Sequence, residues 1–471
     1  MTKRGPAIGV IALVLVGAWA VDATVDRPAP TVTERVQTPM GARSGARSSA
    51  WFCAGATAEE GGEADGTVVV ANAGRQPLTG TVTVMPEEGE PRQVGLSVPA
   101  SGHQSVRLRD VLTAPYASAL VELDGGEAVV ELAATGPLGR SVTPCASSAS
   151  TTWYFAEGVT TRDAREVITL FNPFPEDAVV DLVFNTEEGE VTPQALTGLS
   201  VKGRAMTAVT VGDHVQRRLA VAARISARAG RLVAARLQTF DGSEGRRGMS
   251  VGLGAAAPGD VWYFPEGFLT DGLTERFQIF NPGSEEAEVA VNLALEQGQA
   301  EPIVLTVPPE SRVTLAANDE ARIPKNVAHA VTVRSTNGVP VVVERTIDAV
   351  APAARSGVSI IIGARAPATR WVVAAAQSDD TTEAWLVVHN PGASATRVTV
   401  ALLDGSASVP PGLAAIEVGA RARRAIKLTG TVRPGPVPVL VTATQPVVVE
   451  RDLYAIGSLG TAMSPAVPLR D

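Results

Sequence analysis

Residues 248–252 read Gly-Met-Ser-Val-Gly, the spacing of a nucleophile elbow, in which a serine on a tight strand-to-helix turn attacks an acyl carbon. The chain repeats itself, and the matching copy at residues 357–361 reads Gly-Val-Ser-Ile-Ile, without the second glycine. The alternation of strands and helices that a hydrolase sheet needs is also missing from the sequence pattern. We therefore expect Ser250 to have no nucleophilic role, and we assign no catalytic residue.

The other polar residues suggest neither a metal site nor a cofactor site. The four histidines occupy unrelated positions in the repeats: His103, His214, His329 and His389. Neither a zinc site nor a Ser-His-Asp set follows from these spacings. The acidic clusters at residues 187–190 and 285–288 lack the spacing of a calcium loop, and no phosphate-binding glycine motif is present. We expect no cofactor and no metal, with a fortuitous Ca²⁺ site in a loop as the alternative.

The chain has two cysteines, Cys53 and Cys145, near the beginning and the end of the first repeat. In an exported protein such a pair is expected to form a disulfide. The bond would close a loop of about 92 residues and stabilise the fold by roughly 4–5 kcal/mol in the chain-entropy model. A free or catalytic thiol is the alternative, which the absence of a histidine close by in the sequence disfavours.

Charged residues recur at matched positions of the repeat. Glu157 and Glu266 lie four residues after a repeated tryptophan, and Arg236 and Arg345 lie 83 residues after it. We predict ion pairs within each repeat, Glu157 with Arg236 and Glu266 with Arg345, that brace the opening segment against a later strand. The fourth repeat has an arginine near the matching place but Ala375 at the glutamate position. Because two of the four repeats lack the carboxylate, acid–base catalysis by these residues is a poor interpretation.

Four copies of one sequence unit position these residues. A tryptophan opens each copy, and an asparagine follows about twenty residues later, at the end of an expected strand. The repeat-core residues are Trp51, Trp153, Trp262, Trp371, Asn72, Asn172, Asn281 and Asn390. The last three tryptophans are 109 residues apart, far more than the roughly 20–50 residues of a solenoid or propeller repeat. This period suits one small β-domain per copy.

The apolar residues that follow each asparagine alternate with the period of a strand. In the second copy Val180, Leu182 and Phe184 lie at +8, +10 and +12, and the other copies keep this parity except for Gly80 in the first. Shared parity indicates one buried face, because a one-residue slip would turn every side chain to the opposite face. Helical periodicity is not sustained in any useful window. We predict an all-β chain of four tandem immunoglobulin-like β-sandwich domains after an N-terminal signal or anchor helix.

The N-terminal residues differ in composition from the repeats. Lys3 and Arg4 precede an apolar run that ends at Val21, a pattern typical of an export signal and short for a membrane span of about 20 residues. A cleaved signal peptide and an uncleaved membrane anchor both stay open. We divide the chain into this signal or anchor at 1–25, a flexible stalk at 26–50, and immunoglobulin-like domains at 51–150, 151–259, 260–368 and 369–471.

The second and third repeats open with Trp-Tyr-Phe-Ala-Glu-Gly at 153–158 and Trp-Tyr-Phe-Pro-Glu-Gly at 262–267, and Asn-Pro turns and Val-Val-Val-Glu-Arg segments (341–345 and 447–451) occur later in the chain. Together they resemble the repeats of a secreted actinobacterial family of unknown function. The resemblance covers most of residues 51–471, and it implies export and tandem β-domains but no activity. The first and fourth repeats depart from the six-residue motif, so the motif is not essential in every copy.

The composition limits the partners that we expect. The chain has 471 residues, a formal net charge of −9, and 45% hydrophobic but only 4% aromatic residues. The negative charge disfavours nucleic acid and anionic membrane surfaces. We expect a non-enzymatic, extracytoplasmic cell-envelope protein, secreted or anchored by its N-terminus, that serves as a structural or protein-interaction scaffold. Its partner would be an envelope protein or a cell-wall polymer, with membrane contact only through an uncleaved N-terminal segment. A module that binds cell-envelope glycan is the alternative.

Overall fold

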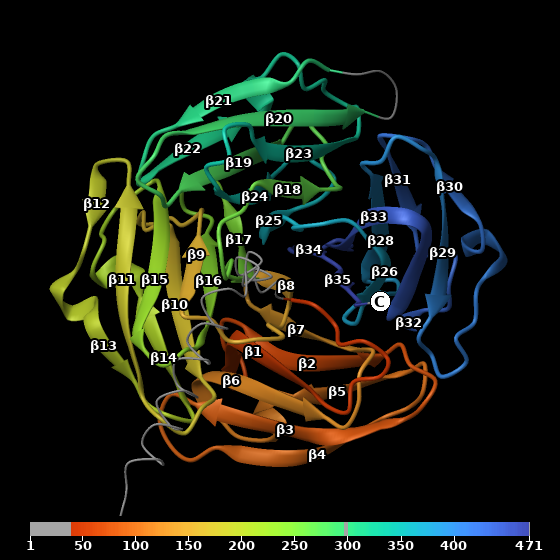
Figure 1. Cartoon of the computed structure of the whole chain (residues 1–471), viewed down its shortest axis with the longest axis horizontal. Helices are drawn as coiled ribbons and strands as arrows, with labels where there is room; N and C mark the ends of the chain where they lie inside the picture. The colour runs from red at the N-terminus through yellow and green to blue at the C-terminus, as the bar shows by residue number, and fades with distance from the viewer. Residues whose placement is uncertain (1–38, 296–299, 471) are drawn as a thin grey trace, which may run out of the picture. The chain divides into compact units, whose positions relative to one another are not determined.

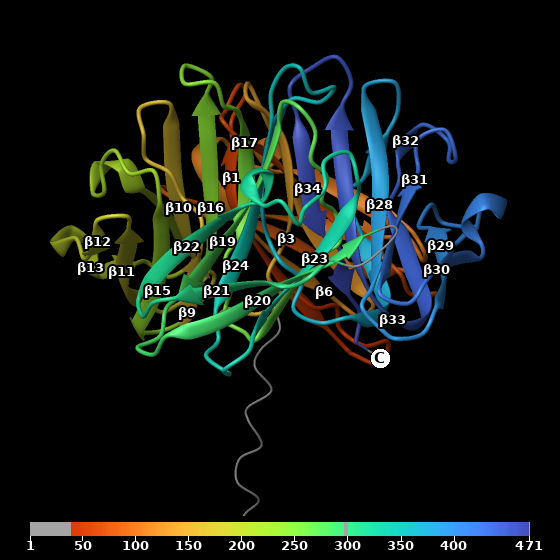
Figure 2. The ribbon, with the colours of Figure 1, turned by 90° about the horizontal axis from the view of Figure 1, so that it is seen from above.

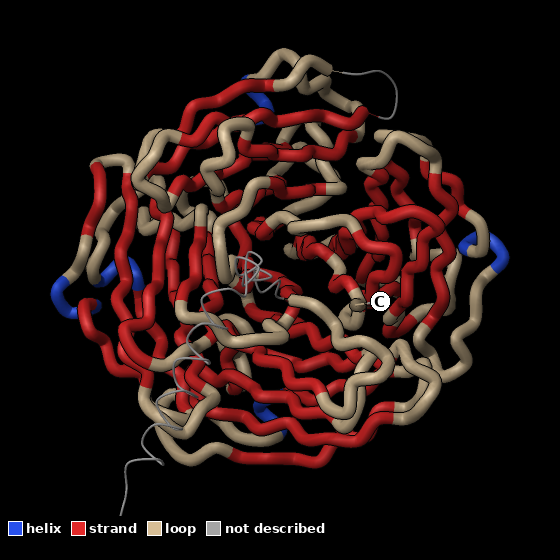
Figure 3. Tube along the Cα trace, viewed as in Figure 1, coloured by secondary structure: helices blue, strands red, loops and turns tan. Residues whose placement is uncertain are grey.

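The computed structural model describes residues 39–295 and 300–470. The predicted signal or anchor at 1–25 and residues 26–38 of the predicted stalk lie outside the described residues. The described part consists of strands and turns with five short 3-10 helices (Figure 3). None of its helices has the length and apolar character needed to cross a membrane. The all-β fold class is therefore confirmed for the described residues.

The elements of the four repeats follow one another along the chain. The first repeat contains β1 (Ser49–Ala58), β2 (Asp65–Asn72), β3 (Leu78–Pro86), β4 (Arg92–Val98), β5 (His103–Arg107), η1 (Leu108–Asp110), β6 (Ala114–Leu123), β7 (Ala128–Gly136) and β8 (Gly139–Pro144). The second contains β9 (Thr152–Phe155), β10 (Ala164–Asn172), β11 (Ala178–Thr186), β12 (Gly189–Val191), η2 (Gln194–Leu196), β13 (Thr197–Val201), β14 (Ala205–Thr210), η3 (Val211–Asp213), β15 (Val221–Ala229), β16 (Val233–Asp241) and β17 (Arg247–Leu253).

The second half of the chain continues the same order. The third repeat contains β18 (Val261–Phe264), β19 (Leu273–Asn281), β20 (Ala287–Leu295), β21 (Ile303–Val307), β22 (Ser311–Ala316), η4 (Ala317–Asp319), β23 (His329–Ser335), β24 (Val342–Ala349) and β25 (Gly357–Ile362). The fourth contains β26 (Ala368–Val373), β27 (Gln377–Ser378), β28 (Thr382–Asn390), β29 (Thr396–Leu402), η5 (Pro411–Leu413), β30 (Ile416–Val418), β31 (Ala422–Lys427), β32 (Gly435–Pro436), β33 (Val439–Ala455), β34 (Thr461–Pro465) and β35 (Val467–Pro468).

Each repeat folds into two antiparallel sheets. In the second repeat their strand orders are β14-β10-β16-β17 and β12-β11-β15-β9, and in the third repeat they are β22-β19-β24-β25 and β18-β23-β20-β21. In the fourth repeat the long strand β33 serves both sheets, since residues 439–443 pair with β29 and residues 448–455 pair with β28. In the first repeat a single parallel pair, Thr57 with Asp65, connects the two sheets. The chain is thus a tandem array of four β-sandwiches.

The repeated tryptophans lie in the sandwich cores. All four side chains are at most 1% exposed. The indole N–H groups of Trp153, Trp262 and Trp371 donate to the backbone carbonyls of Leu232, Val341 and Val447 at 2.8–2.9 Å. Each of these indoles therefore ties the opening strand of its repeat to a backbone carbonyl about 80 residues later, just before β16, just before β24 or within β33, which accounts for the regular spacing of the tryptophans along the chain.

The repeated asparagines hold the turn that follows the first long strand. The side-chain N–H of Asn281 donates to the carbonyls of Glu285 and Val307, and its side-chain oxygen accepts from the backbone N–H of Gly283. Asn172 and Asn390 make the matching bonds, and Asn72 makes the same kind of contacts. Each asparagine thus satisfies two backbone groups of its own turn and one carbonyl at the end of a later strand, which explains why it recurs at this position of the repeat.

The apolar residues predicted to face the core are buried. Val180, Leu182 and Phe184 are fully buried, as are their counterparts Val289 and Val291 in the third repeat. The strand parity predicted from the sequence is therefore confirmed.

One core position explains the location of the cysteines. Phe155 packs against Gly254, where a Cβ would lie 2.8 Å from the ring, and Phe264 packs in the same way against Gly363. The first repeat has Cys53 at the phenylalanine position and Cys145 at the glycine position. These two residues form a disulfide with a Cα–Cα distance of 4.5 Å, so the predicted pairing is confirmed. The disulfide fills the space that an aromatic ring fills in the second and third repeats.

One strand near the end of each repeat takes part in a closed circuit of contacts. β8 contacts β17, β17 contacts β25, β25 contacts β34, and β34 contacts β8. Their labels gather at the centre of Figure 1, whereas β4, β12, β21 and β30 lie on the outer side. In the perpendicular view of Figure 2, β17 and β34 stand upright near the middle. Residues Thr38–Asp471 consequently form one compact unit.

The two ends of this unit meet. The backbone N–H of Gly41 donates to the carbonyl of Pro468 at 2.9 Å, and the N–H of Arg470 donates to the carbonyl of Gly41 at 3.1 Å. The circuit is thus closed by backbone hydrogen bonds between the first described residues and the last. We use the word junction for the interface between two successive repeats, and the fourth junction joins the fourth repeat to the first.

Candidate functional site

The recurrent arginines cross the junctions between repeats. Arg236 donates from both terminal nitrogens to the carboxylate of Glu344 in the third repeat, at 3.0 and 2.9 Å. Arg345 pairs in the same way with Glu450, and Arg451 donates to Glu131 of the first repeat at 2.8 Å. We call these three pairs the junction clamps: Arg236–Glu344, Arg345–Glu450 and Arg451–Glu131. All six side chains are at most 1% exposed.

This arrangement corrects the predicted pairing within a repeat. Glu157 was expected to pair with Arg236, but its carboxylate lies 2.9 Å from Arg312 of the third repeat. Glu266 was expected to pair with Arg345, but it pairs with Arg423 of the fourth repeat. The spacing in the sequence identifies the charged positions correctly. It does not identify partners that the packing of a second repeat brings in.

Each arginine nevertheless binds the opening segment of its own repeat through the backbone. Arg236 donates to the carbonyl oxygen of Glu157, Arg345 to that of Glu266, and Arg451 to that of Ala375. A backbone carbonyl is present whatever side chain the residue carries. The fourth repeat can therefore keep its arginine while it has an alanine at the glutamate position.

The clamp carboxylates also accept hydrogen bonds from the preceding repeat. The Oε2 atom of Glu344 accepts from the backbone N–H groups of Ala156 and Glu157, each at 2.7 Å. Glu131 accepts likewise from Ala374 and Ala375, at 3.0 and 2.6 Å. A fully buried carboxylate is tolerated only when charged and hydrogen-bonded partners replace water. These contacts supply the partners, and they attach the opening strand of one repeat to the next repeat.

The electrostatics of the second junction follow from this geometry. Burial alone would lower the pKa of Arg236, but Glu344, together with the nearby Glu166 and Glu157, holds that pKa above its ordinary value. The arginine is therefore charged at any physiological pH. Burial raises the pKa of Glu157, and the nearby Arg312 opposes the rise.

The first junction has neither member of a clamp. Leu132 stands where the other repeats have the arginine, and Ala235 stands where they have the glutamate. Both are about 1% exposed. A single buried charge without its partner costs about 3–5 kcal/mol, so the two positions must change together. The sequence obeys this rule at all four junctions.

The second set of ion pairs follows the same rule. The pairs Glu157–Arg312 and Glu266–Arg423 occupy the second and third junctions. At the first junction Gly55 and Met206 take the two positions, and at the fourth Ala375 and His103 take them. A carboxylate and an arginine therefore occur together or not at all, as desolvation of buried charges requires, and the half-exposed His103 stands opposite an alanine.

The serine of the elbow-like motif is also a junction residue. The hydroxyl of Ser250 donates to the carbonyl of Ile360 at 3.1 Å and accepts from its N–H at 2.9 Å. Ser141 makes the same two bonds to Val251 across the first junction. Ser250 is 3% exposed. Ser141 links β8 to β17, and Ser250 links β17 to β25, each through its hydroxyl group. This shared structural role explains why the serine recurs.

The glycine of the Trp-Tyr-Phe-x-Glu-Gly motif makes room for a buried carboxyl or imidazole group. A Cβ on Gly158 would lie 2.5 Å from the carboxylate of Glu166, and one on Gly267 would lie 2.4 Å from the Nε2 atom of His329. The phenylalanine packs beneath a clamp, with the Arg236 guanidinium 5.3 Å from the Phe155 ring centre. In these two repeats the motif therefore packs against buried charged or titratable side chains.

Two equivalent glutamates differ in how they are paired. Glu275 lies 2.9 Å from His329, and both side chains are fully buried. At the matching position of the second repeat, neither oxygen of Glu166 has a hydrogen-bond partner within residues 39–295 and 300–470. Val221 stands where His329 lies in the third repeat. Burial raises the pKa of Glu166 to about 8, so this carboxyl group is mostly protonated at neutral pH.

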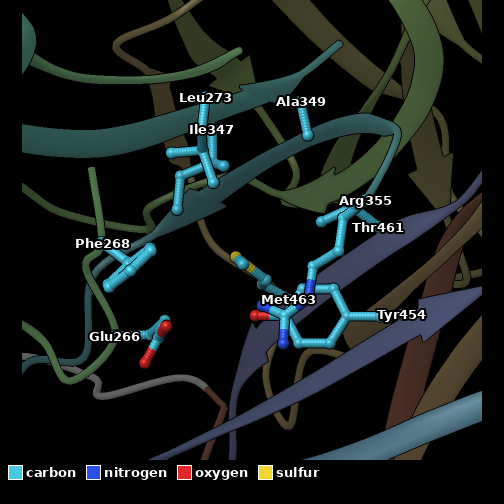
Figure 4. A pocket seen from close by; sticks show the side chains of 9 residues that line it. All are labelled: Glu266, Phe268, Leu273, Ile347, Ala349, Arg355, Tyr454, Thr461 and Met463. Carbon is cyan, nitrogen blue, oxygen red and sulfur yellow. The ribbon is translucent and has the colours of Figure 1, made fainter. Parts of the chain in front are cut away.

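A small pocket opens beside the third junction (Figure 4). Its volume of about 10 Å³ is close to the minimum for one water molecule. The Arg355 guanidinium lies 3.3 Å from the centre of the Tyr454 ring, and Glu266 and Phe268 lie across the pocket from them. The pocket is too small for an organic substrate.

The remaining residues considered for chemistry lie apart from one another. His389 is buried beside Tyr263, and burial lowers its pKa to about 4. Among the described residues no group of three or more His, Cys, Asp or Glu side chains is placed to hold a metal ion. The buried disulfide is typical of proteins that fold in an oxidising, extracytoplasmic environment.

Glu131, Glu344, Glu450, Arg312 and Arg423 are the junction residues that the sequence interpretation missed. A signal for two of them was present, because Glu344-Arg345 and Glu450-Arg451 are the same dipeptide at matching places. A glutamate next to a recurrent arginine on one strand points to the opposite face from it. This geometry indicates that the two side chains serve different neighbours.

Comparisons with known proteins give a family and no function. A family model described as "Family of unknown function (DUF5719)" matches residues 127–311 and 238–467. No curated protein sequence matches the chain. A solved structure of Thermotoga maritima 1070 is 22% identical and covers 23% of this chain and 95% of its own, with a TM-score of 0.21. The Anabaena sensory rhodopsin transducer is 28% identical and covers 18% of this chain and 94% of its own, with a TM-score of 0.17.

A further solved structure is a tetra-tandem repeat from the extending region of a large adhesion protein. It is 13% identical, covers 91% of this chain and 99% of its own, and has a TM-score of 0.10. At these TM-scores none of the three similarities carries an argument about function.

Proposed function

The chain belongs to the family of unknown function DUF5719, and we propose that it is a non-enzymatic protein of the cell envelope, exported from the cytoplasm. In this proposal the four immunoglobulin-like sandwiches act as a structural or protein-interaction scaffold. The partner would be an envelope protein or a cell-wall polymer. We also propose that the family is a secreted actinobacterial one whose repeats carry the Trp-Tyr-Phe-x-Glu-Gly opening.

The main support for the proposal is that the buried ion pairs join neighbouring repeats. The six clamp residues, together with Glu157, Glu266 and their arginine partners, all bridge one repeat to the next. Catalytic acids and bases must instead face a space that a substrate can enter. Charges that fasten four repeats together favour a rigid body that presents its outer surface to a partner.

The disulfide supports the exported location. Cys53 and Cys145 are each 1% exposed and close a loop of 92 residues in the first repeat. Such bonds are rare in the reducing cytosol. The proposal applies both to a secreted protein and to a protein anchored by an uncleaved N-terminal segment. In the second case the anchor would be the one part of the protein in contact with a membrane.

The experiment is cell fractionation of the full-length, C-terminally tagged chain, combined with alkylation of free thiols in each fraction. We expect the protein in the envelope or the medium, with both cysteines protected until a reductant is added. Photo-crosslinkers at exposed positions of the outer strands, such as Val304, would then capture the partner. A cytosolic protein with alkylated Cys53 and Cys145 would refute the exported role. Hydrolase or transferase activity in the purified chain would refute the non-enzymatic role.

A further inference from the structure

A wide groove lies at the third junction, on the solvent face of one sheet. β20 and β23 of the third repeat form its floor, and the turns beside β31 of the fourth repeat form the facing wall. Figure 1 shows β20 and β23 in the third repeat at the top and β31 in the neighbouring fourth repeat at the right. The groove has a volume of about 1120 Å³, far larger than the pocket of Figure 4. Its polar lining includes Tyr263, Asn292, Thr332, Arg334, His389 and Arg421.

The preceding junction shows why the groove exists here. In the second repeat Asn185, on the strand equivalent to β20, donates to the backbone carbonyl of Glu310 across the junction at 2.7 Å. In the third repeat Ala294 takes the place of Asn185, and Arg421 takes the place of Glu310. Glu310 and Arg421 have the same left-handed backbone, with φ of 48° and 51°. Because Ala294 has no amide side chain, no hydrogen bond equivalent to that of Asn185 spans the space between β20 and the turn at Arg421.

The groove carries positive charge in an acidic protein. Arg334 and Arg421 are both exposed, and within the described part of the chain neither forms an ion pair. His389 contributes no charge at neutral pH, because burial lowers its pKa to about 4. The whole chain has a formal net charge of −9. Arg334 lies on the floor of the groove and Arg421 on the facing wall, and two exposed arginines that form no ion pair among the described residues are the arrangement that an anionic ligand fits.

The shape and chemistry of the floor distinguish between anionic ligands. β20 and β23 are the two central strands of the sheet β18-β23-β20-β21, so their backbone groups are already paired and no peptide strand can add to them. Among the lining side chains, Asn292 and Thr332 offer an amide and a hydroxyl group, and Tyr263, which is 9% exposed, adds a phenol, whereas most of the remaining lining is alanine, leucine and proline. These groups suit the many hydroxyls of a sugar.

We propose that this groove binds a saccharide chain that carries carboxylate groups, with Arg334 and Arg421 on its acidic groups and Asn292 and Thr332 on its hydroxyls. This site is independent of the scaffold role proposed above. If the groove binds no saccharide, the protein can still bind its partner as a scaffold. It corresponds to the glycan-binding alternative that the sequence left open, now confined to one junction.

The test is titration calorimetry of the full chain with a hexamer of α-1,4-linked galacturonate at low ionic strength. The neutral methyl ester of the same hexamer and a hexaglutamate peptide serve as matched probes. The combined substitution Arg334→Gln and Arg421→Gln should lower the association constant for the galacturonate about tenfold or more, since two charge-assisted contacts are lost. Arg397→Gln, which removes an exposed arginine outside the groove, is the control and should leave the association constant unchanged.

A second variant tests the geometry while keeping the charges. Ala294→Asn restores the residue with which the second repeat bridges its junction, and it should weaken galacturonate binding by narrowing the groove. The site is overturned if wild-type protein does not bind the galacturonate, or if Ala294→Asn binds it with full affinity. It is also overturned if Arg397→Gln loses as much affinity as the groove variant. Equal binding of the methyl ester or of hexaglutamate would refute the assignment to an acidic saccharide.

Discussion

Glu166 provides the most direct test of how buried charge controls stability at the second junction. Its carboxyl group is 1% exposed, and in the described part of the chain neither oxygen is hydrogen-bonded. Burial raises its pKa from the ordinary value of 4.5 to about 8, against the pull of Arg236. Between these two values the unfolded chain releases the proton while the folded chain keeps it.

The sign and size of the effect follow from linkage. A carboxyl group with a raised folded-state pKa contributes most to stability below pH 4.5, and this contribution is lost as the pH rises towards 8. Each pKa unit corresponds to about 1.4 kcal/mol, so the complete loss is about 5 kcal/mol. Glu166→Gln replaces the titrating carboxyl group by an amide that does not titrate, and it therefore removes this contribution to the pH dependence of the unfolding free energy. We therefore expect the variant to match the wild type near pH 4.5 and to exceed it by up to about 5 kcal/mol near pH 8.

The assay is urea unfolding followed by tryptophan fluorescence at several pH values between 4.5 and 8.5. The matched control is Glu275→Gln, at the same position of the third repeat, where the carboxylate pairs with His329. Glu275 raises the pKa of His329 against burial, so this pair stabilises most below the ordinary histidine pKa of 6.5 and fades as the pH rises further. The control should destabilise most at low pH. The reasoning is refuted if Glu166→Gln is as stable as the wild type at pH 8, or less stable.

The other predictions concern the junctions, and urea unfolding midpoints check each of them. Glu344→Ala leaves Arg236 buried without its carboxylate and should cost about 3–5 kcal/mol, whereas Arg236→Met with Glu344→Leu should cost much less; equal losses would contradict the clamp. Leu132→Arg and Ala235→Glu should each destabilise the first junction alone, and together they should recover about 1–3 kcal/mol of the summed loss by forming a fourth clamp; strict additivity would argue against equivalent geometry at that junction. Ser250→Ala should cost about 1–3 kcal/mol because both backbone groups of Ile360 lose a partner, while Ser200→Ala on an exposed strand should be neutral. An unchanged urea unfolding midpoint for Ser250→Ala would contradict the stabilising role of this serine.

The features that the sequence predicts correctly are local to one repeat. The all-β class follows from period-two alternation, since Val180, Leu182 and Phe184 can share a buried face only on a strand. The tryptophan and asparagine spacings reflect hydrogen bonds inside one sandwich, such as those of Trp153 and Asn281. The disulfide could be predicted because the chain has two cysteines and both fall in the first repeat.

The features that the sequence does not predict lie between repeats. The period of 109 residues shows that Glu157 and Arg236 are equivalent to Glu266 and Arg345, but it does not show which face of one sandwich meets the next. Glu157 therefore pairs with Arg312 and Arg236 with Glu344, both from the following repeat. The groove depends likewise on the absence of a bridge at Ala294, which becomes visible only beside the bridge made by Asn185.

The sequence by itself thus determined the four sandwiches, their buried faces, their turns and the disulfide, because these depend on side-chain periodicity and on contacts within about a hundred residues. Only the tertiary structure decided that the repeats close into a circuit and that their charges are shared across the junctions. The physical reason is desolvation. A buried charge is stable only beside its partner, and where the partner lies is set by the packing of one repeat against another.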